Sequence, residues 1–232
     1  MFALSKNKIA FIIAFVLSNL PHIAQCADQP HNFSKWEKEI SDYEQADRAN
    51  PPPKGAVLFT GASTIRRWTT LKDDFPDCQV INRGFGGSEI VDCTHFADRI
   101  IFPYEPKMIF FRSGGNDIHA GKSPEQVFHD FEDFVAKVHE RLPQTEIYYI
   151  SQNPTVARWS QKDQELALNK MVEDFCTRTP WVKYIDVATM PLDANGQPRL
   201  ELFVDDKLHF NAAGYKLLAE KVRPYLPNNR DK

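Results

Sequence analysis

The sequence predicts an α/β protein built on a parallel sheet. Five short runs rich in β-branched and aromatic residues indicate strands, and stretches with helical periodicity separate them. The expected strands are residues 56–60, 79–82, 108–111, 147–150 and 182–185. Because strands and helices alternate along the chain, we expect the strands to pair in parallel, with the helices packed on the faces of the sheet.

Two of the expected helices carry their own start signals. Residues 123–126 read Ser-Pro-Glu-Gln, a capping box with proline at the first helical position. The apolar positions that follow are spaced as one buried stripe: Val127, Phe128, Phe131, Phe134, Val135 and Val138. Ser160 with Asp163 predicts the start of another helix. The apolar face expected for that helix includes Leu166, Met171 and Phe175.

Two further helices are expected nearer the ends of the chain. The first is indicated by aromatic and apolar residues at helical spacing: Phe33, Trp36, Ile40 and Tyr43. A stiff Pro-Pro-Pro-Lys segment, residues 51–54, separates this helix from the first strand. The last helix is expected over residues 212–225, with Asn211 as its N-cap.

The chain divides into three expected parts. Residues 1–26 read as a secretory signal peptide, because lysines precede an apolar run at 9–17 that gives way to polar and small residues. That run is too short to span a bilayer, so we expect export to the periplasm or the medium, with an acylated Cys26 as the alternative. Residues 27–54 hold the N-terminal helix and the proline-rich lead-in, and residues 55–232 form one domain.

Composition narrows the classes of partner. The chain has 28 Lys and Arg against 31 Asp and Glu, a net charge of -3, which does not favour binding to nucleic acid or to an anionic membrane. Removal of the signal peptide leaves Cys78, Cys93 and Cys176, an odd number, so at most one disulfide forms. A Cys78–Cys93 bridge and buried free thiols are both open, and the cysteine spacing fits no zinc-ligand pattern.

The loop after the first expected strand presents a candidate nucleophile. In an open parallel sheet, ligands bind beyond the carboxyl ends of the strands. Here the chain turns through Gly61, presents Ser63 and continues as a helix. Such a turn lifts a serine hydroxyl clear of the sheet and leaves its N–H in the first helical turn, where backbone donors lack partners. The alternative is that Ser63 only caps the helix.

Three more loops near strand ends carry polar residues. The glycine-rich loop 82–88 can turn backbone N–H groups toward a ligand, but it lacks the last glycine of a dinucleotide fingerprint, so we exclude nucleotide binding. Asn116 and Asp117 place an amide donor and a carboxylate beside the same crevice, or else only shape the turn. Asp206 lies three residues before His209 and can hold one ring nitrogen while the other acts as a base; half a metal site is the alternative.

This order of Ser, Gly, Asn and Asp-x-x-His at successive strand ends resembles a known family. It is similar to the SGNH hydrolases, also called GDSL esterases and lipases, in the branch of the platelet-activating-factor acetylhydrolase subunits. The resemblance covers residues 56–226 and is strongest at Gly-x-Asn-Asp (114–117) and at Asp-x-x-His-x-Asn (206–211), which Gly-Tyr (214–215) follows. One position departs from the family pattern, because Ala62 stands where the family usually has Asp.

The resemblance implies both a fold and a site. The fold is a three-layer α/β/α sandwich with a mainly five-stranded parallel sheet of flavodoxin-like type. In the implied site Ser63 is the nucleophile, His209 the base and Asp206 the carboxylate that orients it. The Ser63 N–H, the Gly87 N–H and the Asn116 side chain form the implied oxyanion hole. No metal or organic cofactor is expected.

The expected activity is hydrolysis of small acyl esters, such as acetyl esters of carbohydrates or lipids, through an acyl-enzyme. Lysophospholipase, thioesterase or acyltransferase activity, and a non-catalytic carbohydrate- or lipid-binding relative, are the alternatives. The expected partner is therefore a small-molecule, glycan or lipid ester, without nucleic acid or stable membrane insertion, and the sequence predicts no oligomeric state. Trp68 and Trp159 follow the first and fourth strands and either wall an acyl pocket or anchor packing.

Overall fold

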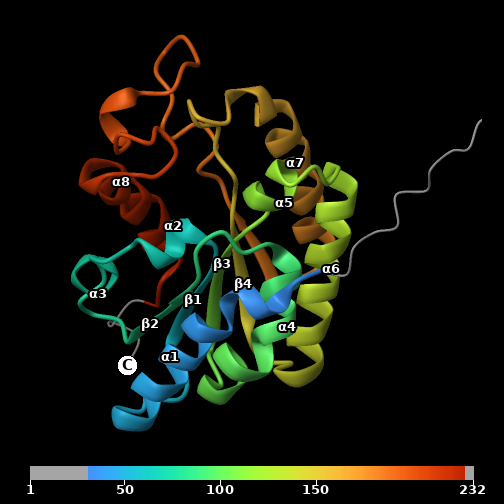
Figure 1. Ribbon diagram of the computed structural model, residues 1–232, viewed down its shortest axis with the longest axis vertical. Helices are drawn as coiled ribbons and strands as arrows, with labels where there is room; N and C mark the ends of the chain where they lie inside the picture. Colours follow the sequence, from blue (N-terminus) through green and yellow to red (C-terminus); the bar gives the residue numbers. More distant parts are fainter. Residues whose placement is uncertain (1–30, 228–232) are drawn as a thin grey trace, which may run out of the picture. The chain divides into compact units, whose positions relative to one another are not determined.

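A five-stranded parallel sheet organises residues 31–227, the part of the chain that the computed structural model describes (Figure 1). Its strands are β1 (Val57–Gly61), β2 (Val80–Gly84), β3 (Met108–Arg112), β4 (Glu146–Ile150) and β5 (Val182–Ile185). They lie in the order β2-β1-β3-β4-β5, with every neighbouring pair parallel. The predicted α/β fold and the five strands are thereby confirmed. The expected signal peptide, Cys26 included, lies outside the described residues.

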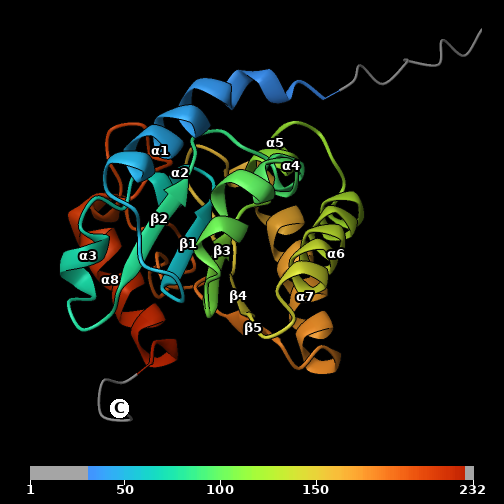
Figure 2. The ribbon, with the colours of Figure 1, turned by 90° about the horizontal axis from the view of Figure 1, so that it is seen from below.

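Helices cover both faces of the sheet and make three layers (Figure 2). One face is covered by α1 (Glu37–Ala49), α4 (Ile90–Ile100), α6 (Pro124–Arg141) and α7 (Lys162–Arg178). The other is covered by α2 (Ser63–Arg66), α3 (Leu71–Asp74) and α8 (Ala212–Val222). A short helix, α5 (Gly115–His119), follows β3. None of the helices within residues 31–227 is both long and apolar enough to cross a bilayer.

Alternation along the strands builds a separate apolar core on each face. On β3, Ile109 and Phe111 belong to the core under α4 and α6, whereas Phe110 belongs to the core under α8. Phe110 pairs in register with Phe59 and Tyr148 on the neighbouring strands, at ring-centroid distances of 4.7 and 4.9 Å. These stacked rings tie the three central strands together and hold the strand ends that carry the site.

Two of the predicted helix caps are confirmed. The Ser123 hydroxyl accepts from the Gln126 N–H at 3.3 Å, and the Ser123 N–H donates to the Gln126 side chain at 2.9 Å. The predicted stripe of α6 is buried except for Phe128, which is partly buried. Asn211 caps α8 by accepting from the N–H groups of residues 213 and 214, and a 3₁₀ turn, η5 (Arg223–Tyr225), continues the chain after α8.

The prediction for α7 was wrong in its start and in part of its face. The helix begins at Lys162, after a 3₁₀ turn, η3 (Trp159–Gln161). Leu166 is 43% exposed, and the buried positions of the helix are instead Glu165, Leu168, Asn169 and Val172. Two of these are polar, and one of the two, Asn169, holds the loop after β4. It exchanges two hydrogen bonds of 2.8 Å with the backbone of that loop, and apolar periodicity cannot predict such a role.

The N-terminal helix α1 packs against α4 and is fixed by a buried ion pair. Arg83, at the end of β2, donates to the Asp47 carboxylate on α1, to the Tyr104 hydroxyl at 2.7 Å and to the Asn82 carbonyl at 2.7 Å. The Tyr104 hydroxyl donates to the same carboxylate. We call Arg83, Asp47 and Tyr104 the α1 cluster. Elsewhere in the fold, no disulfide joins Cys78, Cys93 and Cys176 to one another.

Candidate active site

The close approach of two parallel strands, β1 and β3, sets the turn that points Ser63 out of the sheet. Gly61 has a φ of +127°, and a Cβ there would lie 2.1 Å from the Arg112 carbonyl oxygen of the neighbouring strand. Only glycine fits at position 61, where the two strands approach this closely. The next residue, Ala62, donates its N–H to the same carbonyl at 2.9 Å, and Ser63 then begins α2. As the first residue of a helix, Ser63 has an N–H with no intrahelical partner.

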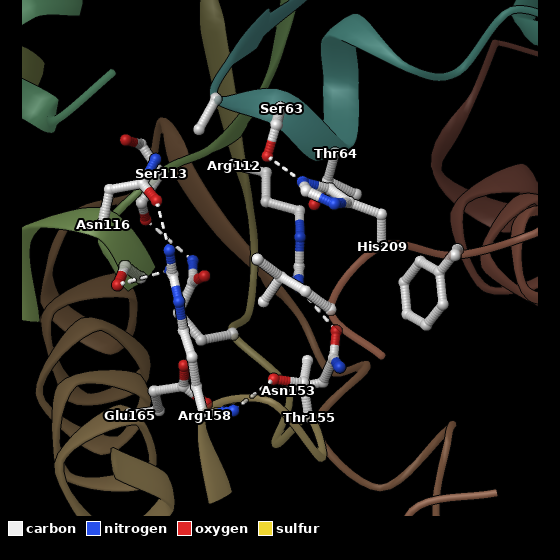
Figure 3. A pocket seen from close by; sticks show the side chains of 15 residues that line it. Ser63, Thr64, Arg112, Ser113, Asn116, Asn153, Thr155, Arg158, Glu165 and His209 are labelled. Atoms are coloured by element: carbon white, nitrogen blue, oxygen red, sulfur yellow. Dashed lines mark hydrogen bonds between the residues drawn. The ribbon is translucent and has the colours of Figure 1, made fainter. Parts of the chain in front are cut away.

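Ser63, His209 and Asp206 form one chain of hydrogen bonds (Figure 3). His209 Nε2 lies 2.9 Å from Ser63 Oγ, and His209 Nδ1 lies 2.7 Å from Asp206 Oδ2. An ionised carboxylate only accepts, so Nδ1 carries the ring proton and neutral Nε2 is left to accept from the serine hydroxyl. The structure therefore brings these three predicted residues together across 146 positions of sequence.

The backbone around His209 holds Asp206 in its ionised form. Its Oδ1 accepts from the N–H groups of Leu208 and His209, both at 2.9 Å. Desolvation works against the charge, but these backbone bonds and the bond to the His209 ring prevail and lower the pKa of Asp206 to about 2. Arg67 Nη1 approaches the carboxylate at 3.7 Å.

Asn116 lies in the same pocket with its amide fixed at both ends. Its Nδ2 donates to the Ser88 carbonyl at 2.9 Å, and its Oδ1 accepts from Arg158 Nη2 at 3.1 Å. Arg158 Nη1 also donates to the Gly115 carbonyl at 3.0 Å. An amide nitrogen carries two hydrogens, so Asn116 retains one that the Ser88 bond does not use. Asn116 thus faces Ser63 and His209 across the pocket as a fixed donor.

Two other predicted residues lie elsewhere. Gly87 is an exposed residue with a φ of +76° in the loop after β2, and it does not line the pocket; its role in an oxyanion hole stays a prediction. The prediction that the Asp117 carboxylate lies beside the crevice was wrong. Asp117 is fully buried and accepts from the Ile90 N–H at 3.0 Å, so it braces the start of α4. This burial raises the pKa of Asp117 to about 6.

Neither Trp68 nor Trp159 lines the pocket. Trp68 is 1% exposed and packs edge-on against Phe59 and Phe75, with its indole N–H donating to Asp74 at 2.7 Å. Trp159 does not line the pocket, and the Lys162 ammonium lies over its ring. Of the two interpretations of these residues, the acyl-pocket wall is therefore wrong and the packing role holds for Trp68.

The pocket between Ser63, His209 and Asn116 has a volume of about 50 Å³ and a lining that is largely polar. Sequence reasoning missed six of its polar residues: Arg112, Gln152, Asn153, Thr155, Arg158 and Glu165. Arg112 carried a detectable signal, because it ends an otherwise apolar strand. Gln152 and Asn153 follow β4 directly, so the rule that strand ends carry ligand sites also reaches them. Glu165, on the far helix α7, gave no local signal.

Burial shifts the pKa values of two charged groups that line the pocket. Desolvation raises the pKa of Glu165 to about 7 even though Arg112 and Arg158 favour its charge. Desolvation likewise lowers the pKa of Arg112, which is 5% exposed. Arg112 donates to the Ser151 carbonyl and, at 2.6 Å, to Asn153 Oδ1. Within residues 31–227, no group of three or more His, Cys, Asp or Glu side chains is placed to hold a metal ion.

Several solved structures share this architecture. A protein of Streptococcus pneumonia, provisionally described as a platelet activating factor, matches with a TM-score of 0.74 and 22% identity over 84% of this chain and 94% of its own. A GDSL-like lipase from Bacteroides thetaiotaomicron matches with 0.66 and 15% over 84% and 98%. An acetylxylan esterase from Geobacillus stearothermophilus matches with 0.60 and 12% over 74% and 94%. At these identities the likeness concerns the fold.

A three-layer parallel α/β fold with a serine, a histidine and an aspartate joined by hydrogen bonds at the strand ends is the architecture of an SGNH-type hydrolase. Family membership is shown by the sequence. Residues 52–217 match the GDSL-like Lipase/Acylhydrolase family, and the chain belongs to it. No curated protein matches the sequence significantly.

Proposed function

We propose that this protein is a serine ester hydrolase in which Ser63 is the nucleophile, His209 the general base and Asp206 its orienting carboxylate. The observation that carries the proposal is the unbroken chain of hydrogen bonds, 2.9 Å from Ser63 to His209 and 2.7 Å from His209 to Asp206. Family membership and esterases among the structural neighbours agree with it. A nucleophile, a base within hydrogen-bond reach and a third group that orients the base are what acyl transfer requires.

The proposed reaction has two steps. The Ser63 oxygen bonds to the ester carbonyl carbon while its proton passes to His209 Nε2, and the C–O bond to the alcohol breaks as His209 returns that proton to the leaving oxygen. Water then attacks the acyl-enzyme, with His209 again taking and returning a proton. The tetrahedral oxyanion is bound by the Ser63 N–H, the Asn116 amide and, on the sequence prediction, the Gly87 N–H. These steps use no metal or organic cofactor.

Small acyl groups are the proposed substrates, with acetyl esters of carbohydrates or lipids as leading members. The pocket volume of about 50 Å³ beside Ser63 supports a short acyl group over a fatty chain.

Labelling with a fluorophosphonate, combined with hydrolysis of p-nitrophenyl esters of increasing chain length and of acetylated sugars, tests the proposal. Wild type should label once, at Ser63, and hydrolyse the shortest esters fastest. Ser63→Ala should neither label nor turn over, while Ser41→Ala, an exposed serine on α1, should behave as wild type. Turnover by Ser63→Ala at the wild-type rate, or labelling at another serine, would refute the assignment.

We also propose that the protein is exported and that the signal peptide, residues 1–26, is removed. Intact-mass analysis of protein from the native host checks this. A chain that starts near Ala27 is expected. A retained N-terminus, or a lipid adduct on Cys26, would contradict it.

A further inference from the structure

Unsatisfied polar atoms concentrate in the pocket beside Ser63. Within residues 31–227, eight buried side-chain nitrogen or oxygen atoms lack a hydrogen-bond partner. Three of the eight, Arg112 Nε, Ser113 Oγ and Glu165 Oε2, belong to residues that line this one pocket. Folded proteins rarely leave buried polar groups unpaired, because each costs about 1–3 kcal/mol. Their clustering points to a polar group that a ligand supplies.

The Gly115 backbone forms the wall of the pocket beside the same polar groups. A Cβ on Gly115 would lie 3.1 Å from Gln152 Oε1, 3.8 Å from Arg158 Nη1 and 3.8 Å from Glu165 Oε1. A side chain here would press on Gln152, so glycine leaves two acceptors and one donor uncovered on this wall of the pocket. Gln152 is held in place, because its Nε2 donates to the Ser113 carbonyl at 2.7 Å. Figure 3 shows Glu165 and Arg158 on the wall of the pocket below Asn116, away from His209.

The charges in this ring do not neutralise one another by contact. Within residues 31–227, Glu165 Oε2 has no hydrogen-bond partner, and Arg112 and Arg158 act on the ionisation of Glu165 through Coulombic attraction. Glu165 is 3% exposed. A buried carboxylate that stands near two guanidinium groups without touching either can accept from a ligand while Arg158 donates to the same ligand.

We propose that this pocket is a subsite for a hydroxylated, sugar-like alcohol, and that Glu165 and Arg158 recognise hydroxyl groups next to the acylated position. The proposal rests on the esterase function proposed above and narrows its substrates from esters of carbohydrates or lipids to esters of carbohydrates. A hydroxyl both donates and accepts, so one group can bridge the Glu165 carboxylate and the Arg158 guanidinium. A second, neighbouring hydroxyl of a sugar ring can donate to Gln152 Oε1 on the wall beside Gly115.

Other chemistries fit this ring less well. An aliphatic chain would leave the buried polar atoms unpaired, and a site built to bind a hydroxyl rejects the analogue that lacks it far more strongly than an apolar pocket rejects an extra one. A carboxylate on the substrate would meet the Glu165 carboxylate. The neutral hydroxyl is the group that serves acceptors and donors together.

A matched pair of acetates tests the proposal. The monoacetylated methyl glucosides and cyclohexyl acetate share an acetyl group and a six-membered ring, and differ in the ring hydroxyls. Wild type should prefer the glucosides in kcat/KM by roughly a hundredfold or more. Glu165→Leu should lower this preference at least tenfold, mainly through KM for the glucosides, and Glu165→Gln should lower it less because the amide still hydrogen-bonds.

The control is Glu173→Leu, the same change on the exposed face of the same helix, which should leave the preference as in wild type. An equal loss on both acetates in Glu165→Leu would make Glu165 a structural residue and overturn the subsite. A wild type without preference would do the same.

A binding arm separates this proposal from the esterase proposal. With Ser63→Ala, saturation-transfer NMR should show binding of the glucoside monoacetates and weaker binding in Ser63→Ala combined with Glu165→Leu. If wild type hydrolyses no ester but this binding pattern holds, the esterase function fails and the subsite stands. If esters are hydrolysed but cyclohexyl acetate binds as well as the glucosides, the subsite fails and the esterase function stands.

Discussion

Two buried arginines lie at the carboxyl ends of β2 and β3, the strands on either side of β1, and differ in what surrounds them. Arg83 near the end of β2 is 9% exposed, and Arg112 at the end of β3 is 5% exposed. Arg83 meets a carboxylate, a tyrosine hydroxyl and a carbonyl in the α1 cluster, and its guanidinium lies 4.8 Å from the Tyr43 ring centre. Arg112 has two neutral acceptors, no ion pair within residues 31–227, and an unpaired Nε.

The difference separates architecture from function. A buried charge that is paired and hydrogen-bonded fixes one element against another, as Arg83 fixes α1. A buried charge left partly unpaired is costly, and proteins keep such groups where a substrate or a reaction uses them. The pocket that Arg112 lines is also lined by Ser63, Asn116 and Glu165. Changes around the pocket should therefore act on activity, and changes in the α1 cluster on stability.

The largest effect is expected at the aspartate that holds His209. Asp206→Asn should lower kcat by about a thousandfold or more, because the amide cannot hold the histidine in the tautomer that leaves Nε2 free. Asp205→Asn, on the exposed neighbouring residue, should change kcat only mildly. Steady-state kinetics on one acetate ester measures both variants. Equal losses would break the assignment of Asp206, and a lower melting temperature for Asp206→Asn would place it with the structural group.

Asn116→Ala comes next. It should cut kcat by about a hundred- to a thousandfold, roughly 2.7 to 4 kcal/mol, with little change in KM, because an oxyanion donor acts mainly in the transition state. Ser63 should still label with fluorophosphonate, more slowly. A raised KM with unchanged kcat would make Asn116 a binding or turn residue.

Replacing each buried arginine by methionine tests the comparison directly. Arg83→Met leaves the Asp47 carboxylate without its partner and should cost about 2 to 4 kcal/mol of unfolding free energy, since breaking a buried pair strands a charge. Arg112→Met strands no carboxylate in a direct pair, so its loss of stability should be smaller, while kcat/KM should fall about tenfold or more as the strand-end loops lose their brace. Urea denaturation and ester kinetics on both variants measure these effects. A larger loss of stability in Arg112→Met, together with a larger loss of activity in Arg83→Met, would contradict the division into a structural and a functional arginine.

The smallest effect is the pH dependence that Glu165 adds to stability. Its pKa lies near 4.5 in the unfolded chain and is raised to about 7 by burial in the fold, with Arg112 and Arg158 opposing that rise. The folded state therefore holds the proton more tightly, and the stability this provides is present below pH 4.5 and is lost as pH rises toward 7. Glutamine does not ionise, so Glu165→Gln does not lose stability at this position as pH rises. Relative to wild type, the variant should gain on the order of 1–3 kcal/mol between pH 5 and pH 8 in urea denaturation. A constant difference would show that Glu165 is not a buried titrating group.

Local sequence patterns predicted the fold well because each element is specified by neighbours in the chain. The Ser-Pro-Glu-Gln box at 123–126 fixes the start of α6, and Asn211 fixes the start of α8. The strand runs were visible because alternate residues of a covered sheet are buried on both faces. The face of α7 was predicted wrongly at Asn169, because that residue is turned inward by hydrogen bonds to the loop after β4, which lies elsewhere in the sequence.

By itself, the sequence determined the order of elements and the types of residue that carry the proposed chemistry: a serine after a glycine turn, an asparagine after β3, and an aspartate three residues before a histidine. Only the tertiary structure decided that these residues meet, with His209 2.9 Å from Ser63, and that Asp117 turns away to α4. It also assembled the ring of Glu165, Arg158 and Gln152 around Gly115. The physical reason is that short-range patterns encode backbone conformation, whereas the distance between side chains on separate strands depends on sheet order, register and packing.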